Sequence, residues 1–213
     1  MVNPLRTLVP FLLIASPLAA QMNRPFVEFG AGTLAPDDPF VVTLALRATA
    51  GWVLGGQNAT TVEYSRQSAP KGHSGNDLGK YARSFLGIAW QHAFHDVFSD
   101  PEPETLQYLV RLSGGTILRG TFPEAVEDQK LRNAPFVGLG LVIQYPLSSR
   151  VAAVGSVEDA IGFLPAETVQ SYCSDQTGYT LCYPQGGPDY YTIDLPNKTQ
   201  HNLGVVLTMQ FRL

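Results

Sequence analysis

Hydrophobic and polar residues alternate strictly at the C-terminal end of the chain. Apolar side chains occupy every second position from Leu203 to Leu213, and the positions between them include the polar residues Thr208, Gln210 and Arg212. Because successive side chains of a strand point to opposite faces, this period predicts a strand with one wholly apolar face. Such a face has to be covered by a protein core or by lipid.

The same two-residue period recurs along most of the preceding chain. We predict eight strands, with the poorest alternation in the seventh. They cover residues 26–33, 40–54, 59–67, 81–94, 106–118, 136–145, 150–163 and 202–213. The pattern indicates no amphipathic helix of several turns between them.

The connections between these strands differ at the two ends. Those after even-numbered strands include the short segments 55–58 and 146–149, whereas those after odd-numbered strands include the long polar segments 68–80, 119–135 and 164–198. Short turns at one end and longer loops at the other are typical of outer-membrane barrels. The sequence therefore predicts an all-β fold, an eight-stranded antiparallel up-and-down transmembrane barrel. Its turns would be periplasmic, and 164–198 would be a long extracellular loop.

Charged residues and glycine recur on the face opposite the apolar one. An eight-stranded barrel has an interior just wide enough for side chains to fill it. Arginine and glutamate can pair there, and glycine leaves room for the long arginine side chains. The predicted lumen charge network comprises Glu28, Arg47, Glu63, Arg83, Arg111 and Arg212. The alternative is a β-sandwich with these charges in solvent and its apolar faces packed together.

The placement of aromatic residues favours the barrel. Membrane barrels carry aromatic girdles at the two interfaces, whereas a sandwich core would bury its aromatic side chains centrally. The residues that lie towards the ends of the predicted strands are Trp52, Trp90, Phe94, Tyr108, Tyr145 and Phe211.

The N-terminal residues predict export. Arg6, an apolar run at 8–15 and a small-residue exit at 16–20 are the three parts of a secretory signal peptide. The apolar run is too short for a spanning helix, which needs roughly 20 residues. We expect residues 1–20 to be the signal peptide and 21–213 the barrel domain. Without Arg6 the formal charge is −5, and no basic patch indicates nucleic-acid binding.

Two cysteines lie in the predicted loop 164–198. In a hairpin that turns at 177–178, Cys173 falls opposite Cys182, and an exported chain meets conditions in which disulfides form. We expect a disulfide-clipped hairpin, with two free thiols as the alternative. Tyrosines of the same loop would either form a contact surface or pack the loop onto the barrel rim, and we favour packing.

With these features the chain resembles the small eight-stranded outer-membrane β-barrel superfamily, related to the transmembrane domain of outer membrane protein A. The most specific match is the alternating strand 202–213. It resembles the assembly signal that the barrel assembly machinery recognises, with Leu207, Met209, Phe211 and Leu213 on its apolar face. The family usually ends in an aromatic residue, whereas this sequence ends in leucine. The resemblance implies a bacterial outer-membrane location and contact with outer-membrane lipid.

Candidate catalytic residues are few and poorly placed. His73 and Ser74 are adjacent in a glycine-rich loop, which rarely gives the geometry of a serine, a histidine and an orienting acid. His92, His95 and Asp96 fit a solvated turn better than a metal site. We expect a non-enzymatic outer-membrane protein with a structural or surface-contact role and no cofactor. The alternatives are an outer-membrane lipid-modifying enzyme similar to a lipid A deacylase, and a soluble exported barrel that binds an apolar ligand.

Overall fold

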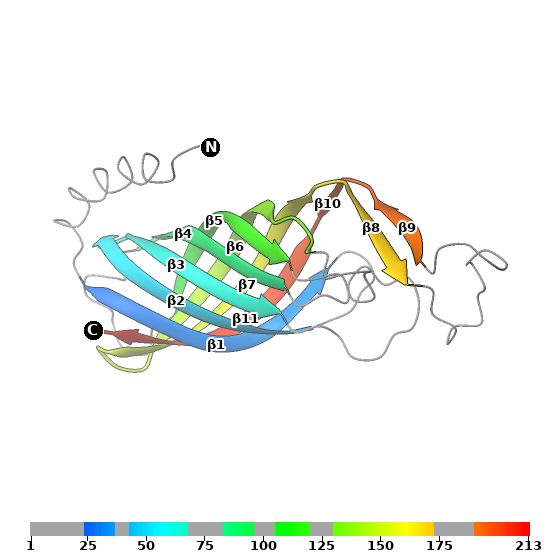
Figure 1. Ribbon diagram of the computed structural model, residues 1–213. Coiled ribbons are helices and arrows are strands. Elements are labelled where there is room, and N and C mark those ends of the chain that lie inside the picture. Colours follow the sequence, from blue (N-terminus) through cyan, green and yellow to red (C-terminus); the bar gives the residue numbers. More distant parts are fainter. Residues whose placement is uncertain (1–23, 37–42, 68–82, 96–104, 120–129, 173–189) are drawn as a thin grey trace, which may run out of the picture.

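The molecule is built from antiparallel strands that curl into a barrel (Figure 1). The computed structural model describes residues 24–36, 43–67, 83–95, 105–119, 130–172 and 190–213. The strands are β1 (Pro25–Pro36), β2 (Thr43–Gly55), β3 (Asn58–Gln67), β4 (Arg83–Ala93), β5 (Gln107–Arg119), β6 (Ala134–Pro146), β7 (Val151–Leu164), β8 (Glu167–Tyr172), β9 (Tyr190–Leu195), β10 (Lys198–Gln200) and β11 (Asn202–Arg212). Among the described residues, no helix is long and apolar enough to cross a membrane.

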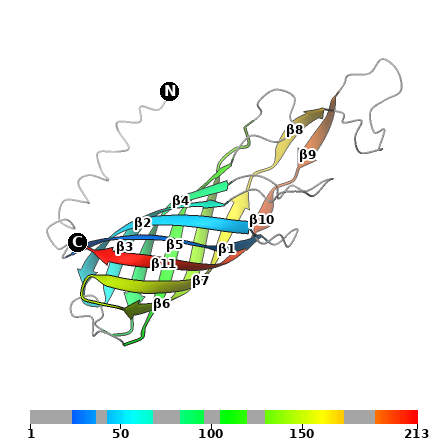
Figure 2. The ribbon, with the colours of Figure 1, turned by 90° about the horizontal axis from the view of Figure 1, so that it is seen from below.

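The sheet closes on itself. Each strand from β1 to β6 pairs antiparallel with the next one along the chain. The last strand, β11, pairs with β1 on one side and with β7 on the other, as Figure 2 shows. β10 continues the line of β11 along β7. The fold is therefore a closed eight-stranded antiparallel barrel, and the predicted fold class is confirmed.

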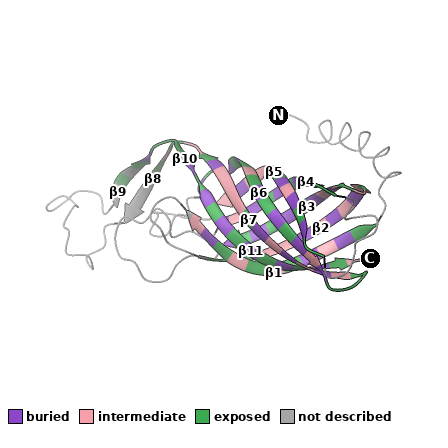
Figure 3. Cartoon of the chain, turned by 180° about the vertical axis from the view of Figure 1, so that it is seen from behind, coloured by how far each residue is buried: buried purple, intermediate pink, exposed green. Residues whose placement is uncertain are grey.

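Burial alternates along the strands, but with the apolar face outside. Leu139, Leu141 and Leu207 point outward and are more than 60% exposed, whereas Thr208 and Gln210 are buried. Figure 3 shows buried and exposed residues in turn along the barrel strands. Water-soluble proteins bury most of their large apolar side chains, whereas this barrel carries many of them on its outer face, as membrane barrels do. The sandwich alternative, which packs the apolar faces together, does not describe this chain.

The described turns at one end of the barrel are tight. Only Gly56 and Gln57 separate β2 from β3, and Gly55 before them has φ of +138°, a conformation that glycine adopts without strain. Between β6 and β7, the backbone N–H groups of Arg150 and Val151 donate to the Ser148 hydroxyl at 3.2 and 3.1 Å. β1 begins and β11 ends at this short-turn end.

The predicted loop 164–198 contains further strands, which corrects the sequence analysis. β8 and β9 pair with each other and project beyond the barrel rim (Figure 1). From Val151–Phe211 to Tyr172–Tyr190 the pairing keeps one register, so this hairpin continues the barrel wall. The ladder is interrupted at Pro165 and Pro196, because proline has no N–H to donate. These prolines made the segment resemble a loop in sequence.

The aromatic residues gather at the short-turn end. Trp90, Phe94, Tyr108 and Phe211 point outward there and are between 39% and 58% exposed. Trp52 and Tyr145 lie on the same end, on β2 and β6, and are half-buried. The six aromatic residues named from sequence thus form one belt around the short-turn end of the barrel.

Candidate functional site in the barrel interior

Four charged side chains meet in the middle of the lumen, and we call them the central ion cluster. They are Arg47 on β2, Glu63 on β3, Arg111 on β5 and Glu158 on β7. Each occupies an inward position, so strand alternation alone directs it into the barrel. The cluster therefore joins strands that are not neighbours in the sheet.

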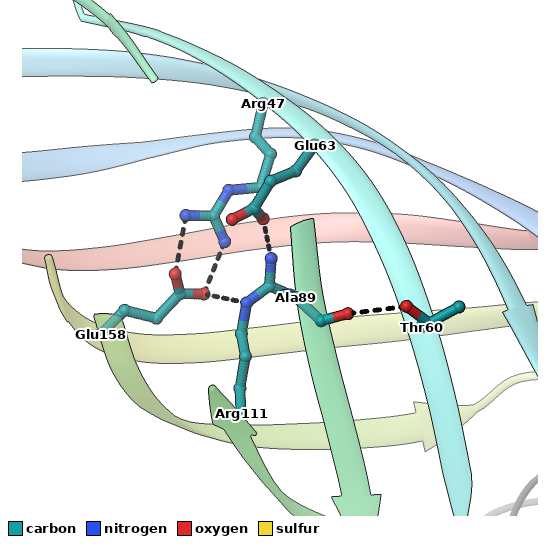
Figure 4. Close-up of polar contacts among 6 residues, drawn as sticks. All are labelled: Arg47, Thr60, Glu63, Ala89, Arg111 and Glu158. Atoms are coloured by element: carbon teal, nitrogen blue, oxygen red, sulfur yellow. Dashed lines mark hydrogen bonds and ion pairs between the residues drawn. The ribbon is translucent and has the colours of Figure 1, made fainter. Parts of the chain in front are cut away.

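The four groups form one chain of ion pairs (Figure 4). Nη1 and Nη2 of Arg47 donate to the two carboxylate oxygens of Glu158, at 2.5 and 2.9 Å. The Nε of Arg111 lies 3.7 Å from Oε1 of Glu158, and its Nη2 is in close contact with Glu63. Arg111 thus lies between two carboxylates. The Arg47–Glu158 pair is fork-shaped, and such two-point arginine–carboxylate pairs are among the strong ion pairs that side chains make.

Glycine residues stand directly across from every member of the cluster. Gly30 pairs with Arg47, Gly87 pairs with Glu63, and Gly140 pairs with both Arg111 and Glu158, and these three glycines have no side chain to fill the lumen there. A Cβ at Gly140 would lie 2.7 Å from Cγ of Glu158. The glycines therefore make the space that the long charged side chains occupy.

A second polar chain lies beside the cluster. Gln144 Nε2 donates to Gln210 Oε1 at 2.9 Å, and Gln210 Nε2 donates to Glu28 Oε1 at 2.9 Å. Both glutamines and Glu28 are fully buried. Because a buried polar group without a partner is costly, these bonds account for glutamine in the interior.

Apolar side chains close the lumen on both sides of the polar layer. One cluster lies towards the short-turn end and consists of Phe26, Val53, Ala59, Ala93, Leu109, Val142 and Val154. The other lies towards the long-loop end and consists of Leu34, Ala45, Phe85, Ile117, Ala134 and Phe136. The rings of Phe85 and Phe136 meet edge to face, with centroids 5.5 Å apart. The interior of the barrel is a packed core, with charges between two apolar layers.

The structure divides the six residues predicted as one lumen charge network. Arg47, Glu63 and Arg111 belong to the central ion cluster, and Glu28 lies beside it. Arg83 lies near the long-loop end, where its Nη1 donates to Gln200 Oε1 at 2.5 Å. Arg212 lies at the opposite end, with Nε 3.4 Å from Gln210 Oε1. Four of the six therefore gather near the middle of the lumen, and Arg83 and Arg212 lie towards its two ends.

Sequence reasoning missed Glu158, the residue that links the two arginines. It lies on β7. Apolar and polar residues alternate poorly along this strand, because the inward-facing Ala152 and Val154 are apolar and buried. The signal that could have identified it is glycine: Gly140 and Gly204, on either side of β7, both pair with this position.

An ion pair at the barrel rim holds the hairpin of β8 and β9 in place. Arg119 at the end of β5 donates to Glu167 Oε1 at 2.8 Å, and both side chains are buried. The backbone N–H of Arg132 donates to the same oxygen at 3.0 Å. Thr168 Oγ1 donates to Asp194 Oδ1 at 2.8 Å, across the hairpin itself. The start of β8 is therefore held against the barrel.

Other predicted residues fall outside these sites. Leu207, Met209, Phe211 and Leu213 all point outward, and their role as an assembly signal stays a prediction. His92 Nδ1 lies 3.0 Å from Asn58 Oδ1, and the described residues include no cluster that could hold a metal. The predicted signal peptide at 1–20 and the residues His73, Ser74, Asp96, Cys173 and Cys182 lie outside the described residues.

Comparison with known proteins identifies the fold. No family model and no curated protein sequence matches the chain. Neisserial surface protein A is similar over 89% of this chain and 97% of its own, with 11% identity and a TM-score of 0.55. The attachment invasion locus protein Ail of Yersinia pestis covers 90% of this chain and 99% of its own, at 9% identity and a TM-score of 0.44. A major outer membrane protein of Thermus thermophilus covers 90% and 100%, at 11% identity and a TM-score of 0.44. The chain has the fold of small eight-stranded outer-membrane barrels.

Proposed function

We propose that this chain is a non-enzymatic protein of the bacterial outer membrane, with a structural or surface-contact role. The supporting observation is the outward band of large apolar side chains around a barrel with polar groups inside. In water this band would be a contiguous apolar patch far larger than soluble monomers expose. In lipid the same band is covered, and the closed ladder of hydrogen bonds leaves no strand edge unpaired.

The packed interior argues against transport through the barrel. The central ion cluster and the two apolar clusters fill the lumen at three levels. An eight-stranded barrel leaves no aqueous channel once side chains fill it. Protein reconstituted into planar lipid bilayers should therefore give no stepwise conductance.

The surface-contact role is proposed for the hairpin of β8 and β9. It extends the barrel wall past the rim, and the pair Arg119–Glu167 fixes its base. The similar protein from Neisseria is named as a surface protein, which agrees with a role at the cell surface. The lipid-modifying alternative rests on His73 and Ser74, which lie outside the described residues.

Fractionation and surface labelling together test this proposal. The protein should sediment with outer membranes and resist carbonate extraction, whereas recovery in the soluble periplasm would contradict the proposal. Orientation is tested in a variant in which both cysteines are replaced by serine. Thr168→Cys on β8 and Ser149→Cys at the short-turn end then provide a matched pair of exposed positions. A membrane-impermeant maleimide should label only the first in intact cells, and the reverse result would invert the topology.

A further inference from the structure

A histidine lies within the aromatic belt, on the outward face of β4. His92 stands between Trp90 and Phe94, which occupy the outward positions two residues before and two residues after it. Tyr108 on β5 lies beside Phe94, whose backbone N–H donates to the Tyr108 carbonyl at 3.5 Å. Trp90, Phe94 and Tyr108 are all exposed. Because aromatic belts mark the headgroup level of a bilayer, His92 lies where a lipid headgroup can reach it.

The two neighbouring rings hold the imidazole of His92 in place. The ring of Trp90 is stacked on the imidazole, with centroids 5.4 Å apart and an interplanar angle of 16°. The ring of Phe94 meets the imidazole in a T-shaped arrangement, with centroids 6.3 Å apart. A side chain whose orientation is already fixed loses less entropy when it binds a ligand.

Asn58 determines which nitrogen of His92 carries a proton. Asn58 pairs with His92 across β3 and β4, and His92 Nδ1 lies 3.0 Å from Asn58 Oδ1. An amide oxygen can only accept a hydrogen bond, so Nδ1 is the donor, and a neutral imidazole then has its lone pair on Nε2. Nε2 makes no hydrogen bond with any residue that the structure describes. It therefore offers a hydrogen-bond acceptor within the aromatic belt.

We propose that His92 and the rings beside it bind the primary ammonium group of a phospholipid headgroup in the adjacent leaflet. The ammonium group donates one N–H to Nε2 of His92, and the faces of the exposed aromatic rings attract its positive charge. A trimethylated headgroup keeps the positive charge but has no N–H to donate. A lipid phosphate diester has no donor either, and it would need His92 in its charged form. The acceptor at Nε2 therefore favours a primary ammonium group over both.

The inference rests on the proposed membrane location, but a binding assay in detergent does not require that location. The full protein in dodecyl maltoside micelles is titrated separately with the dihexanoyl forms of phosphatidylethanolamine, phosphatidylcholine and phosphatidylglycerol. The NMR signal of the Trp90 indole N–H follows binding, and the nitrogen chemical shift of His92 Nε2 reports whether this atom carries a proton. His92→Phe keeps a ring between Trp90 and Phe94 but has no nitrogen, and Asn58→Val removes the acceptor for Nδ1. His201→Phe, at an exposed histidine of the long-loop end, is the matched control.

We expect phosphatidylethanolamine to shift the Trp90 signal in a saturable manner. It should bind about tenfold more tightly than the other two lipids, or by about 1.4 kcal/mol, with Nε2 of His92 unprotonated in the complex. His92→Phe should abolish this preference and Asn58→Val should reduce it, while His201→Phe leaves it unchanged.

Three results would overturn the proposal. They are equal binding of the three lipids, a preference that survives in His92→Phe, and a proton on Nε2 in the complex, which would indicate that a charged imidazole binds the phosphate instead. A soluble location in cells would contradict the proposed function without changing these titrations.

Discussion

Removing one charge from the central ion cluster should destabilise the barrel strongly. Glu158→Gln keeps the size of the side chain, so it creates no cavity beside Gly140 and changes mainly the charge. Arg47 would then lose its carboxylate partner, which now accepts bonds of 2.5 and 2.9 Å. Arg111 would keep Glu63 but lose the second carboxylate, now 3.7 Å away.

The size of the effect follows from burial. The side chains of Arg47 and Glu158 are 9% and 12% exposed, so water cannot replace the lost partner. Breaking a buried ion pair by removing one member costs about 3–5 kcal/mol, because the other charge stays buried and uncompensated. We therefore expect Glu158→Gln to lower the free energy of unfolding by about 3–5 kcal/mol.

Two further variants separate this cause from general damage. Arg47→Met combined with Glu158→Gln removes both charges, so it should recover much of the loss, with a coupling energy of about 0.5–3 kcal/mol. Arg66→Met removes an exposed arginine and should change stability by less than about 0.5 kcal/mol.

Urea unfolding in detergent micelles measures these differences, with the fluorescence of Trp52 and Trp90 as the reporter. A loss below about 1 kcal/mol for Glu158→Gln would refute the reasoning, since an exposed ion pair contributes no more than that. A double variant as unstable as the sum of Glu158→Gln and Arg47→Met, each measured alone, would refute it as well.

Other substitutions test the two faces of the barrel and its outer hairpin. Leu207→Arg, at the middle of β11, should cost about 2–4 kcal/mol in lipid, and Leu203→Arg, on the same face near the rim, about 0–1 kcal/mol. Equal losses of stability at the two positions would contradict the expectation that a charge costs most at the middle of the bilayer. Gly51→Ala adds a methyl group against a buried phenylalanine ring and should cost about 1–3 kcal/mol in urea unfolding. Gly114→Ala should be tolerated, because the added carbon has its nearest neighbour at 3.6 Å. The two cysteines should appear as one linked peptide in non-reducing mass spectrometry, and two unlinked thiols would reject the predicted disulfide.

Sequence alone predicted the strands of the barrel because alternation is a local property. The predicted segment 59–67 corresponds to β3 at Asn58–Gln67, and the predicted segment 150–163 corresponds to β7 at Val151–Leu164. The sequence analysis expected a hairpin only around Cys173 and Cys182. It missed the longer strands β8 and β9, because Pro165 and Pro196 interrupt their continuation from the barrel and proline usually indicates a loop.

The partners inside the lumen could not be predicted in the same way. Arg47 and Glu158 are 111 positions apart, and they meet only because the sheet closes. Their charges could be assigned to the inward face from alternation, but which charges meet depends on stagger and closure. The inward face is also not uniformly polar, since two apolar clusters lie on either side of the ions, which obscured the pattern around Glu158.

The central claim is that the outward apolar face contacts lipid, and spin labels on that face test it most directly. Single cysteines at Leu203, Leu207 and Leu141 carry a nitroxide, in a variant in which both native cysteines are replaced by serine. Collision rates with oxygen and with a water-soluble nickel chelate are then measured in lipid vesicles. We predict high oxygen and low nickel access at Leu207 and Leu141, and more nickel access at Leu203, which lies nearer the rim. Nickel access at Leu207 and Leu141 as high as at Leu203 would contradict the claim.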